Sequence, residues 1–287
     1  MVASMGFKLG DLDLQVISGG RFRLDGGILF GVVPKVLWQR RAEPNDLNRI
    51  QLETNCLLVH TPEHNVLIDT GYGNKGGARQ RVNYELEAGH RLTENLMGVG
   101  IEPDSIDVVI QTHLHFDHAG GCTVVDETGG LRPTFPHARY FVQEAEWEDA
   151  TCDRPELAGT YMRPDFMSIK ETGVLELVNG DTDLMPGIGC CATGGHTRGH
   201  QILYLGTGHE RAVYLGDLCP TSWHLQTFWA MAYDQYPLDL RRIKLRVLGE
   251  AADHDWLVLF AHDAQVKAAY LRRDDKQQFV VREQIAL

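Results

Sequence analysis

The sequence predicts an α/β (α+β) protein built from two packed β-sheets, each covered by helices on one face. Strand-like apolar runs alternate with helical patterns in both halves of the chain. Segments 51–69 and 201–217 also repeat one order of features: an apolar strand, a polar turn, a second apolar strand and an aspartate. No linker rich in Pro, Gly or Ser separates the halves. We therefore interpret residues 1–287 as a single domain, with 1–50 as an N-terminal extension.

The N-terminal extension is expected to be rich in strands and then irregular. Alternating apolar residues in 11–33 predict strands, with turns at the two Gly-Gly pairs. Residues 28–48 show no clean period and carry aromatic side chains. They fit a lid, a contact with a second subunit in a homodimer, or a plain surface loop.

The rest of the chain alternates between predicted strands and helices. The strand at 175–178 is expected to begin the second half, and the helix at 238–248 has the clearest amphipathic pattern. In that helix Leu240, Ile243 and Val247 share one face, and the basic residues, Lys244 among them, are placed elsewhere. Strands are expected at 51–60, 66–68, 108–110, 140–142, 175–178, 189–193, 201–205, 212–215 and 256–260, and helices at 85–97, 144–150 and 238–248.

The composition limits the classes of partner. The net charge of −12 argues against nucleic acid, whose binding usually needs a basic face. No apolar run reaches the roughly 18 residues of a membrane span, and the N-terminus lacks the basic and apolar regions of a signal peptide. We therefore expect a cytoplasmic protein without a membrane partner, whose six cysteines are reduced and mostly buried.

The stretch from Thr112 to His118 carries the clearest chemical signal. It places His113, His115, Asp117 and His118 directly after a short apolar run. Alternate residues of an extended segment share a face, so the first two histidines can point the same way while the other two ligands approach from a second direction. Chance would give these residues this spacing about once in 10⁵–10⁶ positions. The arrangement suits two adjacent metal ions.

Three further residues share a signature with this stretch. His196, Asp217 and His262 each follow small residues or the end of a predicted strand, where functional side chains concentrate. They complete the donor set that a dinuclear metal centre needs, and Asp217 can bridge because its two oxygens can reach two ions. Assigned by position, the remaining ligands are His113, His115 and His196 for one ion and Asp117, His118 and His262 for the other.

These motifs, together with Gly195-His196-Thr197-x-Gly199-His200, resemble the metallo-β-lactamase superfamily over roughly residues 50–265. The resemblance implies a four-layer αββα sandwich with two divalent metal ions at one edge between the sheets. The donors suit Zn²⁺, and Mn²⁺, Co²⁺ or Fe would also fit. The stretch Leu67-Ile68-Asp69-Thr70-Gly71 looks like the superfamily's first motif, which implies that Asp69 orients the metal-binding loop from behind the ligands.

The residues around the motifs narrow the resemblance. Asp217 stands where one class of β-lactamases carries Cys, and Glu146-Trp147 and Met231-Ala232-Tyr233-Asp234 look like the quorum-quenching lactonases related to methyl parathion hydrolase. That likeness implies a metal-dependent hydrolase that opens N-acyl homoserine lactones by attack of a metal-bridging hydroxide. The alternatives are an organophosphate or aryl ester hydrolase, a glyoxalase II-like thioesterase, and a metal-binding protein without catalysis.

The resemblance also assigns roles near the metals. Asp117 is a candidate to carry a proton to the leaving oxygen. Some lactonases place a substrate-binding Tyr three residues after the bridging Asp, but this chain has Pro220 there. His224 or Tyr233 could substitute, or no side chain does. The predicted pocket wall, each member of which could instead be a core or dimer contact, is Phe30, Trp38, Phe116, Trp223, Phe228 and Trp229.

Overall fold

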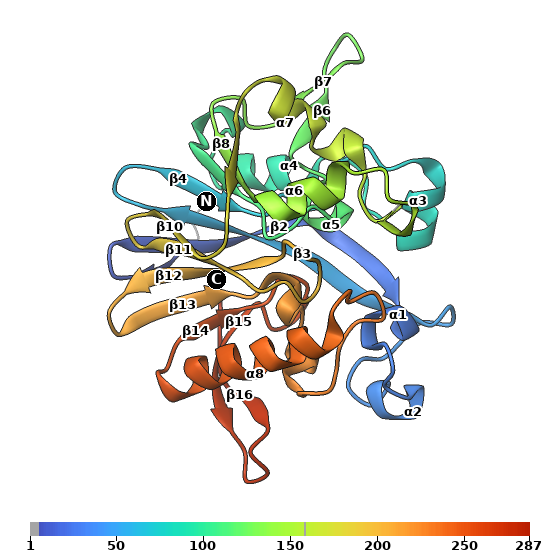
Figure 1. The fold of residues 1–287 in the computed structure, drawn as a ribbon, viewed down its shortest axis with the longest axis vertical. Helices are drawn as coiled ribbons and strands as arrows, with labels where there is room; N and C mark the ends of the chain where they lie inside the picture. The colour runs from blue at the N-terminus through green and yellow to red at the C-terminus, as the bar shows by residue number, and fades with distance from the viewer. Residues whose placement is uncertain (1–5, 158) are drawn as a thin grey trace.

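The computed structural model describes residues 6–157 and 159–287. In this part of the chain, two seven-stranded sheets pack face to face, and helices lie against their outer faces (Figure 1). The arrangement is the αββα sandwich that the sequence motifs implied. None of the helices among the described residues is both long and apolar enough to cross a membrane.

The first sheet has the strand order β1-β2-β3-β4-β5-β8-β9. It is antiparallel from β1 to β4, and parallel from β4 through β5 and β8 to β9. Its strands are β1 (Phe7–Leu9), β2 (Leu12–Asp25), β3 (Arg49–His60), β4 (Asn65–Ile68), β5 (Val108–Ile110), β8 (Arg139–Gln143) and β9 (Leu175–Val178).

The second sheet has the order β10-β11-β12-β13-β14-β15-β16. A parallel pair, β13 with β14, follows the hairpin β12–β13, as β4 with β5 follows the hairpin β3–β4. This confirms the repeated order seen in the sequence. The strands are β10 (Thr182–Met185), β11 (Ile188–Ala192), β12 (Gln201–Thr207), β13 (Glu210–Tyr214), β14 (Leu257–Leu259), β15 (Ala268–Arg273) and β16 (Phe279–Ile285), and a small separate sheet contains β6 (Thr123–Val125) and β7 (Leu131–Pro133).

The helices are short, except for α8, which lies against the second sheet (Figure 1). The α-helices are α1 (Gly26–Phe30), α2 (Lys35–Trp38), α3 (Ala78–Tyr84), α4 (Arg91–Gly98), α5 (Phe116–Ala119), α6 (Glu144–Thr151), α7 (Met167–Glu171) and α8 (Pro237–Asp253). The 3₁₀ helices are η1 (Pro103–Ser105), η2 (Pro155–Leu157), η3 (Arg163–Asp165), η4 (Gly216–Leu218) and η5 (Ser222–Leu225).

The core follows from the two-residue period of the strands. In β3, Leu57 and Val59 point between the sheets, whereas Leu58 packs against the helices outside the first sheet. Adjacent Cys190 and Cys191 likewise point to opposite faces of β11. Neither forms a disulfide, and the cysteines in the described part of the chain are free, as the sequence predicted.

Several predicted elements were wrong in detail. The strand at 175–178 is β9, the edge of the first sheet, so the second sheet begins at β10. The helix expected at 85–97 starts only at Arg91, and α3 precedes it with a break between them. Glu85, in the left-handed conformation, ends α3, which separates the two helices.

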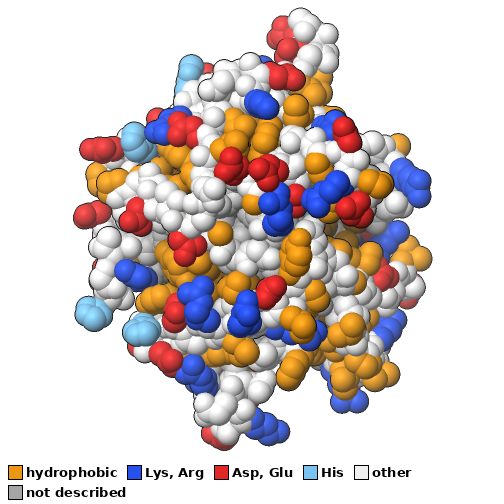
Figure 2. Space-filling model, viewed as in Figure 1, with side chains coloured by type: hydrophobic (Ala, Val, Ile, Leu, Met, Phe, Trp, Pro, Cys, Tyr) orange, Lys and Arg blue, Asp and Glu red, His pale blue; other side chains and the backbone are white. Residues whose placement is uncertain are grey.

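The N-terminal extension is part of the sandwich rather than an appendage. β2 runs for 14 residues alongside β3, and its first Gly-Gly pair forms an irregularity in the pairing instead of a turn. The region 28–48, expected to be irregular, contains α2, and α1 reaches into it. Hydrophobic side chains gather over these helices at the lower right of Figure 2, and Val32, Val36 and Leu37 of this region are exposed. The dimer contact expected here stays a prediction.

Candidate metal centre

The candidate ligands lie where strands end. β5 ends at Ile110, and His113 and His115 follow in the loop that leads into α5. Asp117 and His118 lie in the first turn of α5, so the motif combines an extended loop with one helical turn. This change of direction brings the two pairs of ligands to the same place from different sides.

The other three ligands come from the second sheet. His196 lies between β11 and β12, Asp217 follows β13, and His262 follows β14. Gly216, at φ +49°, turns the chain just before Asp217, and a Cβ there would lie 2.7 Å from His200 Nε2. A side chain is therefore excluded at this position, which explains the glycine beside the bridging aspartate.

The structure brings all seven predicted ligands together in two buried groups. One contains His113, His115, His196 and Asp217, and the other contains Asp117, His118 and His262; the ligand atoms in each lie within 4.8 Å of one another. Their role as metal ligands remains our proposal.

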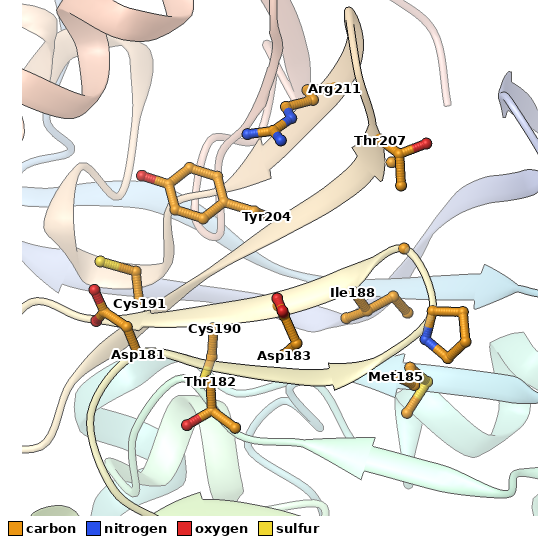
Figure 3. Close-up of a pocket in the computed structure, with 14 residues that line it drawn as sticks. Asp181, Thr182, Asp183, Met185, Ile188, Cys190, Cys191, Tyr204, Thr207 and Arg211 are labelled. Atoms are coloured by element: carbon orange, nitrogen blue, oxygen red, sulfur yellow. The ribbon is translucent and has the colours of Figure 1, made fainter.

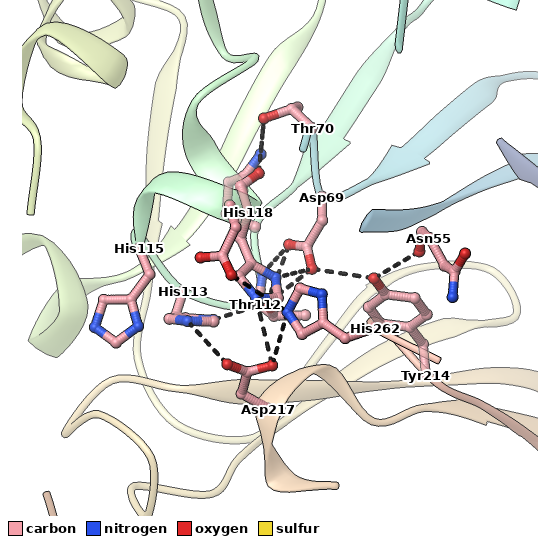
Figure 4. A network of polar contacts seen from close by, with 12 residues as sticks. Asn55, Asp69, Thr70, Thr112, His113, His115, His118, Tyr214, Asp217 and His262 are labelled. Carbon is pink, nitrogen blue, oxygen red and sulfur yellow. Dashed lines mark hydrogen bonds and ion pairs between the residues drawn. The ribbon is translucent and has the colours of Figure 1, made fainter. Parts of the chain in front are cut away.

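Asp217 joins the two groups (Figure 4). Its Oδ2 lies 3.2 Å from His196 Nε2 and 3.9 Å from His113 Nε2. Its Oδ1 lies 3.2 Å from His262 Nε2 and 3.4 Å from His118 Nε2. Each carboxylate oxygen thus faces one group, which is the placement that a bridging ligand requires.

Bound cations explain the short distances between the donor atoms better than hydrogen bonds among the side chains do. His118 Nε2 lies 2.8 Å from His262 Nε2, and His196 Nε2 lies 2.9 Å from His115 Nδ1. Two neutral ring nitrogens facing in this way both present lone pairs unless a proton or a cation lies between them. Asp217 Oδ1 and the Nε2 atoms of His113 and His115 are buried without a hydrogen-bond partner. Since buried polar atoms are normally satisfied, the set fits two divalent ions.

The charge states follow from burial and neighbours. Burial lowers the pKa of His113 well below its usual value, and the imidazoles of His118, His115 and His196 lower it further. Burial also lowers the pKa of His118, but the carboxylates of Asp217 and Asp69 outweigh it and raise the value. Burial would raise the pKa of Asp217, yet its histidine neighbours hold it well below the usual range. Asp217 is therefore ionised, as a ligand must be.

Asp69 lies behind His118, where the sequence placed it. Its Oδ2 accepts a hydrogen bond from His118 Nδ1 at 2.8 Å, and its Oδ1 accepts one from the Thr112 amide at 2.8 Å. Because an ionised carboxylate can only accept, His118 carries its proton on Nδ1 and turns Nε2 toward the centre. Asp69 has a φ of +58°, in the left-handed region that side chains rarely adopt.

Asp234 plays the same part for His196, and the sequence analysis missed it. Its Oδ1 accepts a hydrogen bond from His196 Nδ1 at 2.8 Å, although 38 residues separate the two. Its Oδ2 accepts one from the Met231 amide at 2.7 Å, which closes a tight turn. The only signal in the sequence was its place in the Met231–Asp234 stretch. That stretch supported only the family resemblance, and no role was predicted for the Asp234 carboxylate.

Glu146 was also missed as a structural link. Its side chain is fully buried; Oε1 accepts the Leu114 amide at 2.9 Å, and Oε2 accepts the Thr197 hydroxyl at 2.5 Å. Burial raises the pKa of Glu146, and these hydrogen bonds act in the opposite direction. Because Leu114 lies between two ligands of the first loop and Thr197 follows His196, this one carboxylate ties together the ligand loops of both sheets.

A cavity of about 230 Å³ opens beside the centre. Of the residues predicted to face substrate, Phe116, Asp117 and Tyr233 line it. The full set of lining residues is Leu24, Ile28, Tyr84, His115, Phe116, Asp117, Gly159, Thr160 and Tyr233. Leu24, Ile28, Tyr84 and the pair Gly159 and Thr160 gave no functional signal in the sequence.

The other predicted pocket aromatics do not line this cavity. Phe30 and Trp38 are buried and stack on each other at 5.1 Å between ring centres. Trp223 and Trp229 pack edge-on around the same Phe30. Phe228 is 73% exposed. The first four side chains therefore form a small aromatic core around Phe30, because a compact cluster buries more apolar area than an open pocket does. Phe228 is a surface residue.

His224 is also placed away from the cavity. Its Nε2 lies 2.9 Å from the Leu29 carbonyl oxygen and its Nδ1 2.8 Å from the Thr221 hydroxyl, so both ring nitrogens are engaged inside the protein. The ring stacks on Phe30, and burial, followed by the charge of Lys244, lowers its pKa to about 3. His224 is therefore a neutral core residue rather than one that contacts substrate.

A larger cavity, of about 630 Å³, lies against the strands β10 to β13 (Figure 3). Asp181, Cys191, Tyr204 and Arg211 are among its lining residues, and none of the candidate metal ligands is. Its size alone does not make it the reaction site, because it lacks the convergent buried donors found at the edge of the sandwich.

Comparison with known proteins identifies the family of this chain. A family model described as the metallo-beta-lactamase superfamily matches residues 49–222. The N-acyl homoserine lactonase AiiA of Bacillus thuringiensis subsp. kurstaki is 31% identical over 176 residues, 58% of this chain and 63% of the lactonase. The alignment therefore spans less than two thirds of that curated relative.

Solved structures extend the likeness to nearly the whole chain. A probable metal-dependent hydrolase from Staphylococcus aureus aligns with a TM-score of 0.86 and 32% identity, over 98% of this chain and 100% of the other. AidC, a dizinc quorum-quenching lactonase in complex with a product, aligns with a TM-score of 0.79 and 20% identity, over 99% of each chain. The second likeness shows the fold alone.

Proposed function

Because this chain belongs to the metallo-beta-lactamase superfamily, we propose that it is a metal-dependent hydrolase that opens the ring of N-acyl homoserine lactones. The observation that carries the proposal is Asp217, whose two oxygens face the two buried ligand groups. The similarity to the N-acyl homoserine lactonase AiiA supports the substrate class. Hydrolysis of a lactone also needs no cofactor beyond metal ions.

The donor set defines where the metals would bind. His113, His115 and His196 would hold one ion, and Asp117, His118 and His262 the other, with Asp217 shared between them. Two divalent ions at such a centre supply Lewis acidity, which activates water near neutral pH and polarises a carbonyl group. Zn²⁺ is our proposal for both ions. The remaining steps depend on the side chains of the chain itself.

Tyr233 is placed to bind the substrate. Its ring centre lies 5.5 Å from that of His196 and 6.1 Å from that of His115, and it lines the cavity. Although the ring is partly exposed, burial around the hydroxyl and the negative charges of Asp117 and Asp217 raise its pKa well above 10. The hydroxyl therefore remains a hydrogen-bond donor, and it would bind a lactone oxygen in place of the Tyr absent at Pro220.

Asp117 and the cavity wall complete the reaction scheme. Asp117 lines the cavity and also lies 3.6 Å from His262 Nε2, so it could accept the proton that the attacking water loses and pass it to the alkoxide that leaves when the ring opens. Leu24, Ile28 and Phe116 give the cavity an apolar side that suits an acyl chain and excludes water.

A substrate panel tests the proposal. Purified protein with its metal content measured is assayed on N-hexanoyl-L-homoserine lactone, a paraoxon-type phosphotriester and S-lactoylglutathione. We expect the lactone to give the highest kcat/KM. Metal-loaded protein that turns over the phosphotriester or the thioester but not the lactone would contradict the substrate assignment. Turnover of none of the three would contradict the hydrolase assignment.

A further inference from the structure

Lys244 lies on the buried face of α8. The sequence analysis placed it away from the apolar face of this helix, but the side chain is 1% exposed. It occupies the same stripe as the buried Leu240, Val247 and Leu248, at the i, i+4, i+7, i+8 spacing of one helix face. Burying an ammonium group costs free energy unless all of its N–H groups form hydrogen bonds, so Lys244 needs partners inside the protein.

The three partners of Lys244 are backbone carbonyl oxygens of one loop. Its Nζ donates to the carbonyl oxygens of His224 at 3.1 Å, Gln226 at 3.4 Å and Trp229 at 2.5 Å. An ammonium group has three N–H donors and no acceptor, so these contacts use its full capacity. One side chain of α8 thereby fixes three points in a segment of six residues.

The 222–236 loop, which we define by those residues, is also held at its two ends by hydrogen bonds to other segments. At its start, Ser222 donates from its amide and its hydroxyl to Asp263 Oδ2, at 2.8 and 2.6 Å. At its end, the Gln235 amide donates to the His196 carbonyl oxygen at 3.0 Å. The 3₁₀ helix η5 ends at Leu225, so two of the three Lys244 contacts, those to Gln226 and Trp229, hold a part of the loop that has no helix or strand hydrogen bonds.

The 222–236 loop carries two residues of the site. Tyr233 lines the cavity, and Asp234 hydrogen-bonds His196. The loop also meets the cavity wall, because the Ala232 amide donates to the carbonyl oxygen of Ile28 at 2.9 Å. A shift in the middle of the loop would therefore move the hydroxyl of Tyr233 away from a bound substrate.

We propose that Lys244 is a positioning residue that fixes the 222–236 loop and so sets the place of Tyr233 at the cavity. It contacts neither the substrate nor the candidate ligands, and acts through the three carbonyl groups. The kinetic consequence rests on the function proposed above, whereas the effect on the loop does not.

The test replaces Lys244 with Met, which keeps the length and removes the donors. Arg242→Met, on the exposed face of the same helix, is the matched control. Backbone hydrogen exchange, metal content and lactone kinetics are measured on both variants and on the parent protein. In Lys244→Met we expect exchange within 222–236 to rise about tenfold while the rest of α8 and the 195–199 segment stay protected. Metal content stays at the parent level, and KM for N-hexanoyl-L-homoserine lactone rises about tenfold with kcat changed less than threefold.

Parent-like exchange in 222–236, together with a parent-like KM in Lys244→Met, would overturn the proposal. So would faster exchange spread evenly over the chain, because that indicates a general loss of stability.

If Lys244→Met does not fold, Lys244→Gln, which keeps two N–H donors, takes its place. If neither folds, the parent protein decides: amides of 224–229 that exchange as fast as the exposed 127–130 turn would refute the role of Lys244, and slow exchange would support it. A parent protein without lactone turnover refutes the proposed function and leaves the exchange result standing.

Discussion

At the candidate metal centre, the ligands follow the ends of β5, β11, β13 and β14, whereas the cavity beside it is lined from five segments far apart in the sequence. The ligands are buried and share hydrogen bonds with Asp69, Asp234 and the Glu53 carbonyl. Leu24 and Ile28 of the cavity come from β2 and α1, outside the region that the family model matches. Because the candidate ligands are held by buried hydrogen bonds, whereas the cavity is formed by packing between distant segments, changes in the two regions should have different consequences.

Replacing Asp217 with Ala should have the largest effect, because the substitution removes the side chain whose two oxygens join the two ligand groups. We expect kcat to fall about 1000-fold or more and metal content to drop below two ions per chain. Activity assays and metal analysis of the same sample measure this. Asp183→Ala, an exposed carboxylate on β10 of the same sheet, is the control and should behave like the parent. Full metal content with near-parent turnover in Asp217→Ala would remove the bridging role.

Asp234→Ala should weaken the centre less, since it removes the hydrogen bonds to His196 Nδ1 and the Met231 amide but leaves all seven candidate ligands in the chain. Loss of such a partner typically costs 10- to 100-fold in metal affinity or activity, and we expect about that loss here. Competition with a chromogenic chelator measures the affinity. Asp239→Ala, half-exposed on α8, serves as the comparison. An affinity equal to that of the parent would show that His196 is held by its surroundings without the carboxylate.

Tyr233→Phe tests the cavity rather than the centre. It removes a hydroxyl and keeps the ring, so metal content should stay unchanged while kcat/KM for the lactone falls about tenfold, or about 1.4 kcal/mol. Steady-state kinetics with metal analysis separates the two regions. A parent-like kcat/KM would mean that the hydroxyl does not touch the substrate.

Phe228→Ser should have the smallest effect. The side chain is 73% exposed and outside the cavity, so kcat/KM should change less than about twofold and the free energy of unfolding by no more than about 0.5 kcal/mol. Phe116→Ala, which shortens the cavity wall, should lower kcat/KM more than Phe228→Ser does. If Phe228→Ser weakens lactone binding as much as Phe116→Ala, then the boundary drawn here between cavity and surface is misplaced.

The sequence alone was sufficient to predict that the seven candidate ligands lie together, because their positions follow from local features of the chain. A strand end places a side chain at the edge of a sheet, and small neighbours such as Gly216 make room for it. The repeated strand, hairpin and aspartate pattern placed the two sheets together, so the seven ligands could be gathered without knowing any loop.

The cavity could not be predicted in this way, because it depends on packing between distant segments. Aromatic residues at 30 and 38 looked suited to a pocket, but they bury more apolar surface by stacking on each other. Lys244 and Asp234 show the same limit. The sequence analysis set the basic Lys244 apart from the apolar face of its helix, and only the path of the 222–236 loop supplies the carbonyl oxygens that make its burial tolerable.

The central claim is that Asp217 unites two ligand groups into one dinuclear centre that hydrolyses lactones. Titration of metal-free protein with Zn²⁺, with lactone turnover recorded at each addition, tests it most directly. We predict that turnover rises until two ions per chain are bound and then stays constant. Turnover that is maximal at one ion per chain, or that appears without metal, would contradict the claim.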